Sequence, residues 1–285
     1  MTALVTFAKK RNIAMKYNLK PDPSLSVKHI RISGVPTLML RPAQAAPIRV
    51  GILWIHGGGY ITGRKEMVYK AAGADFVRNY RAIVFSPAYR LAWLHPYPAA
   101  VNDCFAVLDY MNSHKKDLGI DHLMVAGGSA GGGLCAAVCM MARDRGIHVD
   151  FQMPLYPMIS NIDTDSSRDN HGKVWNTRRN HLGWRVYLRG NAKKAVSPYA
   201  APAQQTDYSN LPPCYTFVAD GEPFYAETLQ YVQHLRDADV QADVDVYHTN
   251  VHAFDMQRPE EPISIQARSR LMDRFEQVLD EIGCV

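Results

Sequence analysis

One short run of residues constrains the fold of this chain more than any other, the sequence G-G-S-A-G at 127–131. An apolar stretch at 122–126 precedes it, and a stretch rich in alanine and glycine follows it to residue 143. This order predicts a strand, a tight turn and a helix, with small residues where the backbone is strained. Such a turn presents a serine hydroxyl at the end of a sheet, beside the free N–H groups of the helix. A phosphate-binding loop would need a Gly-Lys-Ser/Thr ending, which the run lacks. We therefore predict that Ser129 is a nucleophile.

The rest of the chain favours an α/β fold around this turn. Strand-like and helix-like patterns alternate after residue 48, which is typical of a mostly parallel central sheet flanked by helices. Ahead of them we expect a short basic helix at 1–20 and a hairpin of strands 27–32 and 37–41. The later expected strands are 48–56, 81–86, 122–126, 151–156, 215–219 and 244–248. The expected helices are 68–80, 101–112, 130–143, 226–238 and 263–282. Together these elements predict one domain over 1–285.

The segment at about 160–195 interrupts the alternation. It is polar, and it carries Trp175 and Trp184. A long irregular insertion in a compact domain is usually a functional cap or lid. We expect a small cap made of 160–195 and approximately 1–25, whose tryptophans either cover the site or are buried within the cap.

A second glycine-rich run, H-G-G-G-Y at 56–60, follows the apolar strand expected at 48–56. Consecutive glycines let backbone N–H groups approach a substrate closely and stabilise the oxyanion formed during ester hydrolysis. We predict an oxyanion hole made by Gly58, Gly59 and Ala130, the residue after the nucleophile. His56 is expected to orient this loop rather than to react. Tyr60 and Ile61 are expected to bind the substrate.

A serine nucleophile needs a base, and the base needs an acid that orients it. His252 lies in a loop after the strand at 244–248, where the base of such a site is expected. His248 falls within the strand pattern and is expected to be structural. Asp220 and Glu222 both follow the strand at 215–219 and both precede His252, so chain order leaves either as the acid.

These motifs together resemble the bacterial hormone-sensitive-lipase family of α/β-hydrolase esterases, from about residue 48 to the C-terminus. Besides the two glycine-rich runs, the resemblance rests on Y-R-L-A at 89–92, H-P-Y-P-A-A at 95–100, S-P-Y-A at 197–200, L-P-P at 211–213 and V-H-A-F at 251–254. The acid of that family precedes proline and an apolar residue. Glu222 stands in that place, which favours it over Asp220, and Glu227 matches a later acidic position. Gly128 departs from the family, which usually has aspartate there, so we expect altered support of the turn without loss of chemistry.

The resemblance implies a serine carboxylesterase that hydrolyses small, short-chain acyl esters through an acyl-enzyme, with no cofactor and no metal. Two alternatives remain open. One is a non-catalytic small-molecule-binding homologue, similar to the plant gibberellin receptors. The other is an acyltransferase or peptidase that uses the same triad, because a fold alone does not fix the reaction.

The bulk composition narrows the partners and the location. The net charge is +5, from 32 basic and 27 acidic residues that are scattered along the chain, which disfavours a nucleic-acid partner. The most apolar stretch, 134–142, is too short to span a bilayer, and the first residues lack the order of a secretory signal. The five cysteines form no C-x-x-C pair, and their odd number argues against a disulfide framework. We expect a cytoplasmic monomer or homodimer.

Overall fold

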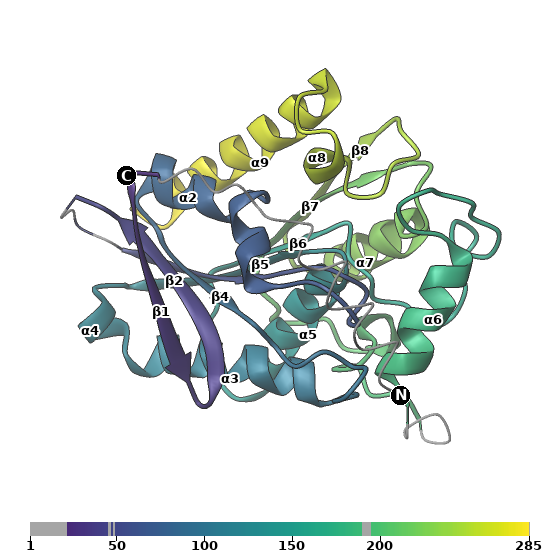
Figure 1. The fold of residues 1–285 in the computed structure, drawn as a ribbon, viewed down its shortest axis with the longest axis horizontal. Helices are drawn as coiled ribbons and strands as arrows, with labels where there is room; N and C mark the ends of the chain where they lie inside the picture. The colour runs from purple at the N-terminus through teal and green to yellow at the C-terminus, as the bar shows by residue number, and fades with distance from the viewer. Residues whose placement is uncertain (1–21, 45–46, 48, 190–194, 285) are drawn as a thin grey trace, which may run out of the picture.

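An eight-stranded sheet runs through the part of the chain that the computed structural model describes, residues 22–44, 47, 49–189 and 195–284 (Figure 1). Its strand order is β1-β2-β4-β3-β5-β6-β7-β8. The strands are β1 (Leu25–Ile32), β2 (Val35–Pro42), β3 (Val50–Ile55), β4 (Ile83–Pro87), β5 (His122–Gly128), β6 (Phe151–Leu155), β7 (Cys214–Ala219) and β8 (Ala242–Tyr247). The hairpin β1–β2 joins β4 in antiparallel fashion, and the strands from β4 to β8 are parallel. The expectation of a mostly parallel sheet is therefore confirmed.

Helices cover both faces of the sheet, so its central strands are buried on both sides. Two helices, α2 (Gly73–Tyr80) and α9 (Pro262–Glu281), lie on one face (Figure 1). They pack together through Phe76 and Phe275, whose ring centroids are 4.5 Å apart. Three helices, α3 (Ala99–Ser113), α5 (Ala130–Asp144) and α7 (Tyr225–Asp237), pack on the other. The shorter elements are η1 (Lys65–Tyr69), α4 (Lys115–Leu118), α6 (Thr177–Tyr187), η2 (Pro202–Gln204) and α8 (Phe254–Gln257). No helix in the described ranges is both long enough and apolar enough to cross a bilayer.

The insertion between β6 and β7 is more ordered than the sequence indicated. We expected irregular structure at 160–195, but α6 occupies its centre. Asn176 caps the helix by accepting a hydrogen bond from the Arg179 backbone at 3.1 Å, a common way to start a helix. The arginines on the exposed side of α6 make the segment polar on average, so its hydropathy does not reveal that one face is buried. That buried face includes Gly183, Trp184 and Tyr187.

The helix expected at 68–80 forms only from Gly73 onward, as α2, while Val68 and Tyr69 belong to η1. A Cβ atom on Gly73 would lie 2.4 Å from Val68 and 2.9 Å from Trp54, so the start of α2 packs closely against both. The basic helix expected at 1–20 lies outside the described residues, as does most of the cap element expected at 1–25.

Candidate active site

The turn between β5 and α5 holds Ser129 in a strained conformation, with φ 60° and ψ −125°. Its backbone N–H donates to Leu155 O at 3.0 Å, and its own carbonyl accepts the N–H groups of Gly133 and Met158, each at 3.0 Å. The helix approaches the sheet so closely that a Cβ atom on Gly131 would lie 2.1 Å from Ile55 O. Main-chain bonds and small residues therefore fix the position of the serine.

The structure brings Ser129, His252 and Glu222 together from the ends of three strands. His252 Nε2 lies 2.9 Å from Ser129 Oγ. On the other side of the ring, His252 Nδ1 contacts Glu222 Oε2. Glu222 is fully buried, and its second oxygen accepts the Ala219 N–H at 3.0 Å. This carboxylate is placed to orient the imidazole and to stabilise its charged form.

The competing carboxylate, Asp220, lies elsewhere. Its Oδ2 is 2.7 Å from His248 Nδ1, and its Oδ1 accepts the Thr249 N–H at 3.2 Å. The His248 side chain is almost fully exposed. Asp220 thus stabilises the start of the loop that leads to His252. The carboxylate that contacts His252 itself is Glu222, two residues further along the chain.

The glycine loop after β3 has the geometry of an oxyanion hole. Gly58 and Gly59 have φ values of 121° and 59°, and the Gly58 carbonyl is occupied by the Thr62 N–H at 2.9 Å. A Cβ atom on Gly58 would lie 2.3 Å from Thr62 O, so only glycine fits there. Among the hydrogen bonds between described residues, none uses the backbone N–H of Gly58, Gly59 or Ala130. Those three donors remain available to a developing oxyanion.

His56 contacts the backbone of this loop, in keeping with the expectation that it orients the loop. Its ring stacks on Tyr89 with 4.1 Å between centroids, and its Nδ1 lies 2.9 Å from Gly57 O. Burial lowers the pKa of His56 to about 4, so the ring is neutral near pH 7. The Tyr89 hydroxyl donates to the His56 carbonyl at 2.9 Å.

The expected substrate contacts of Tyr60 and Ile61 are corrected by the structure. Tyr60 has φ 64°, which turns its ring into the core, where it stacks on Tyr187 at 4.0 Å. The Tyr60 hydroxyl donates to Met158 O at 2.6 Å. Ile61 is 9% exposed and belongs to the same core cluster. Neither residue lines the pocket at Ser129.

The pocket at Ser129 has a volume of about 140 Å³ and is mainly apolar. Trp175 closes one side, against the oxyanion loop, at a place where a Cβ atom on Gly59 would meet its ring at 2.1 Å. Trp184 does not line the pocket and packs on Tyr60 in the core, at 5.4 Å between ring centroids. Several apolar residues of the wall were not predicted from the sequence, among them Met67, Ala71, Val174 and Met256. Of these four residues, only Met256 could have been placed near the site from the sequence, because it follows His252 by four residues.

A larger open groove, of about 890 Å³, lies along the outer side of α6. Its wall includes four arginines, Arg168, Arg178, Arg179 and Arg185, and none of the residues that contact Ser129. The candidate site is therefore the smaller pocket, which is lined by Ser129, His252, Gly58 and Gly59.

Comparison with known proteins agrees with this geometry. Residues 52–256 match the family model described as the alpha/beta hydrolase fold. Esterase LipI of Mycobacterium tuberculosis is 32% identical over 224 residues, which cover 75% of this chain and 67% of the relative. The chain belongs to the α/β-hydrolase family, among its hormone-sensitive-lipase-like esterases. It is a carboxylic ester hydrolase.

Two further α/β-hydrolase relatives extend over more of the chain. Carboxylesterase NlhH of Mycobacterium tuberculosis is 28% identical over 260 residues, which cover 88% of this chain and 81% of the relative. The solved structure of a bacterial heroin esterase superposes with a TM-score of 0.86 at 29% identity, covering 96% of this chain and 90% of that one.

Beside Gly128, where the family resemblance leads us to expect aspartate, the ring of Tyr156 fills the space. A Cβ atom on Gly128 would lie 3.0 Å from the Tyr156 ring. The Tyr156 hydroxyl donates to Asp255 Oδ1 at 2.9 Å, and the ring meets His252 edge-on at 5.3 Å. Tyr156 and Asp255 are both buried, so this pair packs against the turn that carries Ser129 and against the His252 ring.

Glu227, the later acidic position of the family, holds the chain that leaves β6. Its Oε1 accepts the N–H groups of Ile159 and Ser160 at 2.7 and 3.0 Å. Its Oε2 is buried and has no partner among the described residues. Burial raises the pKa of Glu227 to about 8, so the carboxyl is largely protonated at pH 7.

Proposed function

We propose that the protein hydrolyses small esters with short acyl groups, using Ser129, His252 and Glu222 as its triad. The supporting observation is the contact of His252 with both Ser129 Oγ and Glu222 at a pocket bordered by unused N–H donors. Because His252 reaches the serine, the arrangement favours an enzyme over a non-catalytic binder on the same fold.

The reaction proceeds in two halves. His252 takes the proton from Ser129 Oγ, which attacks the ester carbonyl carbon, and the N–H groups of Gly58, Gly59 and Ala130 stabilise the oxyanion. Each such donor contributes roughly 3 kcal/mol to the transition state. His252 then gives its proton to the departing alcohol, and the acyl group stays on Ser129. A water molecule, deprotonated by His252, releases the acid and restores the serine.

The pocket argues for short acyl groups. About 140 Å³ of space, closed by Trp175 and walled by Met67 and Met256, suits an acyl group of two to four carbons. We expect activity on p-nitrophenyl esters to be greatest from acetyl to butyryl and to fall for longer chains. Measuring kcat/KM across a series from acetyl to palmitoyl checks this. A maximum at long chains, with activation at an interface, would contradict the proposed pocket.

We also propose a cytoplasmic location and action as a monomer or homodimer. Four of the cysteines are buried as free thiols, and the fifth, Cys284, is a partly exposed free thiol. Burial raises the pKa of Cys104, Cys139 and Cys214, so these thiols stay protonated and unreactive.

A further inference from the structure

The turn that carries Glu222 is held on one side by the neighbouring strand. The turn connects β7 to α7. The Asp220 N–H donates to Tyr247 O and the Gly221 N–H to Thr249 O, each at 3.0 Å. These bonds continue the pairing of β7 with β8 and fix the turn as far as Gly221. They do not reach the residues that follow Glu222.

Side chains of the insertion hold the other side. Ser166 Oγ donates to Pro223 O at 2.7 Å and accepts the Ala226 N–H at 3.0 Å. Asn170 Nδ2 donates to Gly221 O at 3.2 Å. The residues before and after Glu222 are thus each tied to the insertion, although about fifty residues of chain separate them from it.

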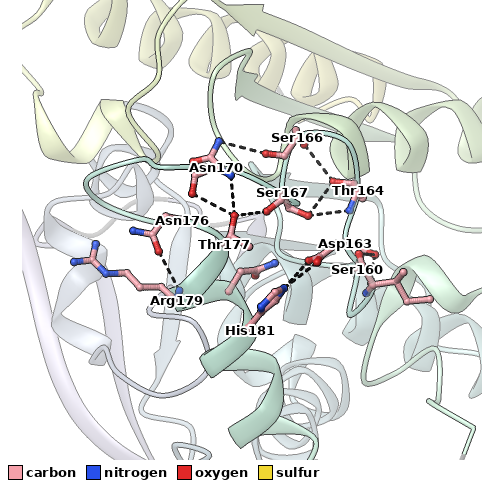
Figure 2. Close-up of polar contacts among 12 residues, drawn as sticks. Ser160, Asp163, Thr164, Ser166, Ser167, Asn170, Asn176, Thr177, Arg179 and His181 are labelled. Atoms are coloured by element: carbon pink, nitrogen blue, oxygen red, sulfur yellow. Dashed lines mark hydrogen bonds and ion pairs between the residues drawn. The ribbon is translucent and has the colours of Figure 1, made fainter.

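The insertion is itself braced by a compact set of hydrogen bonds, which Figure 2 shows. Asn170 Nδ2 also donates to Ser166 O at 3.3 Å, so the two side chains that reach the acid turn are linked. Thr177, the first residue of α6, donates its hydroxyl to Ser167 O at 2.6 Å and accepts the Asn170 N–H at 2.7 Å. At the other end, Glu227 of α7 holds the N–H of Ser160. The segment is thus secured both to α6 and to α7.

We propose that this segment, residues 164–170, positions the triad acid, with Ser166 and Asn170 as its positioning residues. The inference rests on the proposed role of Glu222. Glutamate has one more rotatable bond than the aspartate usual in this role, so the direction of its carboxylate depends more on how firmly its backbone is held. The Ala219 N–H fixes one carboxylate oxygen, and the segment fixes the main chain on both sides. The insertion therefore serves the chemical step as well as covering the pocket.

Two variants test the proposal against a matched control. Ser166→Ala and Asn170→Ala remove the contacts with the acid turn, and Asn176→Ala removes a cap in the same insertion that bonds only Arg179 and Gly172. We expect each of the first two to lower kcat about 10-fold, and the double variant up to about 100-fold, with KM changed less than about twofold. Asn176→Ala should keep kcat within about twofold of the wild type. Ser166→Thr, which retains the hydroxyl, should recover most of the loss.

A spectroscopic measurement separates this proposal from the proposed function. The proton between His252 Nδ1 and Glu222 should give a low-field ¹H NMR signal in the wild type that Glu222→Gln removes. Ser166→Ala and Asn170→Ala should shift or broaden it, and Asn176→Ala should not. This readout does not depend on turnover, so it remains informative even if Ser129→Ala shows that Ser129 is not the nucleophile.

Equal kcat and an unchanged signal in the two variants and the control would overturn the positioning role. A rise in KM alone would also overturn it and would assign the segment to covering the pocket. Thermal unfolding identifies any variant that fails to fold. If Ser166→Ala fails, Asn170→Ala and Ser166→Thr decide the question.

Discussion

The nucleophile turn and the acid turn are built in different ways. At Ser129 the main chain does the positioning, through bonds to Leu155, Gly133 and Met158 and through the close approach of α5 to β3. At Glu222 part of the support comes from side chains of the insertion. The comparison shows that one active site combines a part fixed by the fold with a part that depends on a few polar side chains. The first should tolerate changes in the insertion, and the second should not.

The nucleophile gives the largest expected effect. Ser129→Ala removes the atom that attacks the ester, and we expect kcat to fall by about 10⁶-fold. The fold should persist, because only the hydroxyl is lost and the bonds that hold the turn belong to the main chain. Hydrolysis of p-nitrophenyl acetate measures the loss, and circular dichroism checks the fold. Retention of most of the activity would refute the mechanism.

The acid turn gives the next largest effect and tests which carboxylate acts. Glu222→Gln should lower kcat by about 10⁴-fold, because an amide can hold the imidazole in the wrong tautomer. Asp220→Asn should cost less than about 10-fold, since Asp220 contacts His248 and the Thr249 backbone instead. Both are measured under the same conditions with the same ester. The reverse order would identify Asp220 as the acid.

A smaller effect is expected on the free energy of unfolding, through Glu227 of α7, which accepts the N–H groups of Ile159 and Ser160. The pKa of Glu227 is raised from 4.5 to about 8 in the folded protein. A raised pKa means that its contribution to the free energy of unfolding is complete below about pH 4.5 and is lost as the pH rises towards 8. Glu227→Gln keeps an acceptor for Ile159 and Ser160 but has no proton to lose.

Relative to wild type, this variant should therefore gain stability between pH 5 and pH 8, by up to a few kcal/mol. Urea unfolding at pH 5, 6.5 and 8 gives the difference in free energy at each pH. A constant difference across the three values would show that Glu227 does not change protonation in this range.

The same contrast explains what the sequence could predict. Ser129, Gly58 and Gly59 belong to local patterns that the sequence shows directly, and the strained backbone expected at Ser129 is present. Strand order along the chain placed His252 near the serine. The choice of Glu222 rested on its proline and phenylalanine neighbours, because spacing alone did not distinguish it from Asp220.

The failures have equally physical causes. Tyr60 follows the oxyanion glycines, yet it has a positive φ and its ring lies in the core, stacked on Tyr187. A backbone angle of this kind cannot be inferred from the hydropathy of the sequence. Met67, Met256 and Val174 of the pocket wall come from η1, α8 and the insertion, which approach one another only in the folded chain. Ser166 and Asn170 look like ordinary polar loop residues, and their partners lie more than fifty positions away.

The Tyr156 ring beside Gly128 has a consequence for protein engineering. Introducing at position 128 the aspartate that the family resemblance implies would require space that this buried ring occupies. It would also add a carboxylate beside the Tyr156 hydroxyl, which already donates to Asp255, a carboxyl whose pKa is raised by burial. A side chain at position 128 therefore has to be designed together with Tyr156, which would have to move or become smaller, and with Asp255, to which the Tyr156 hydroxyl is bonded.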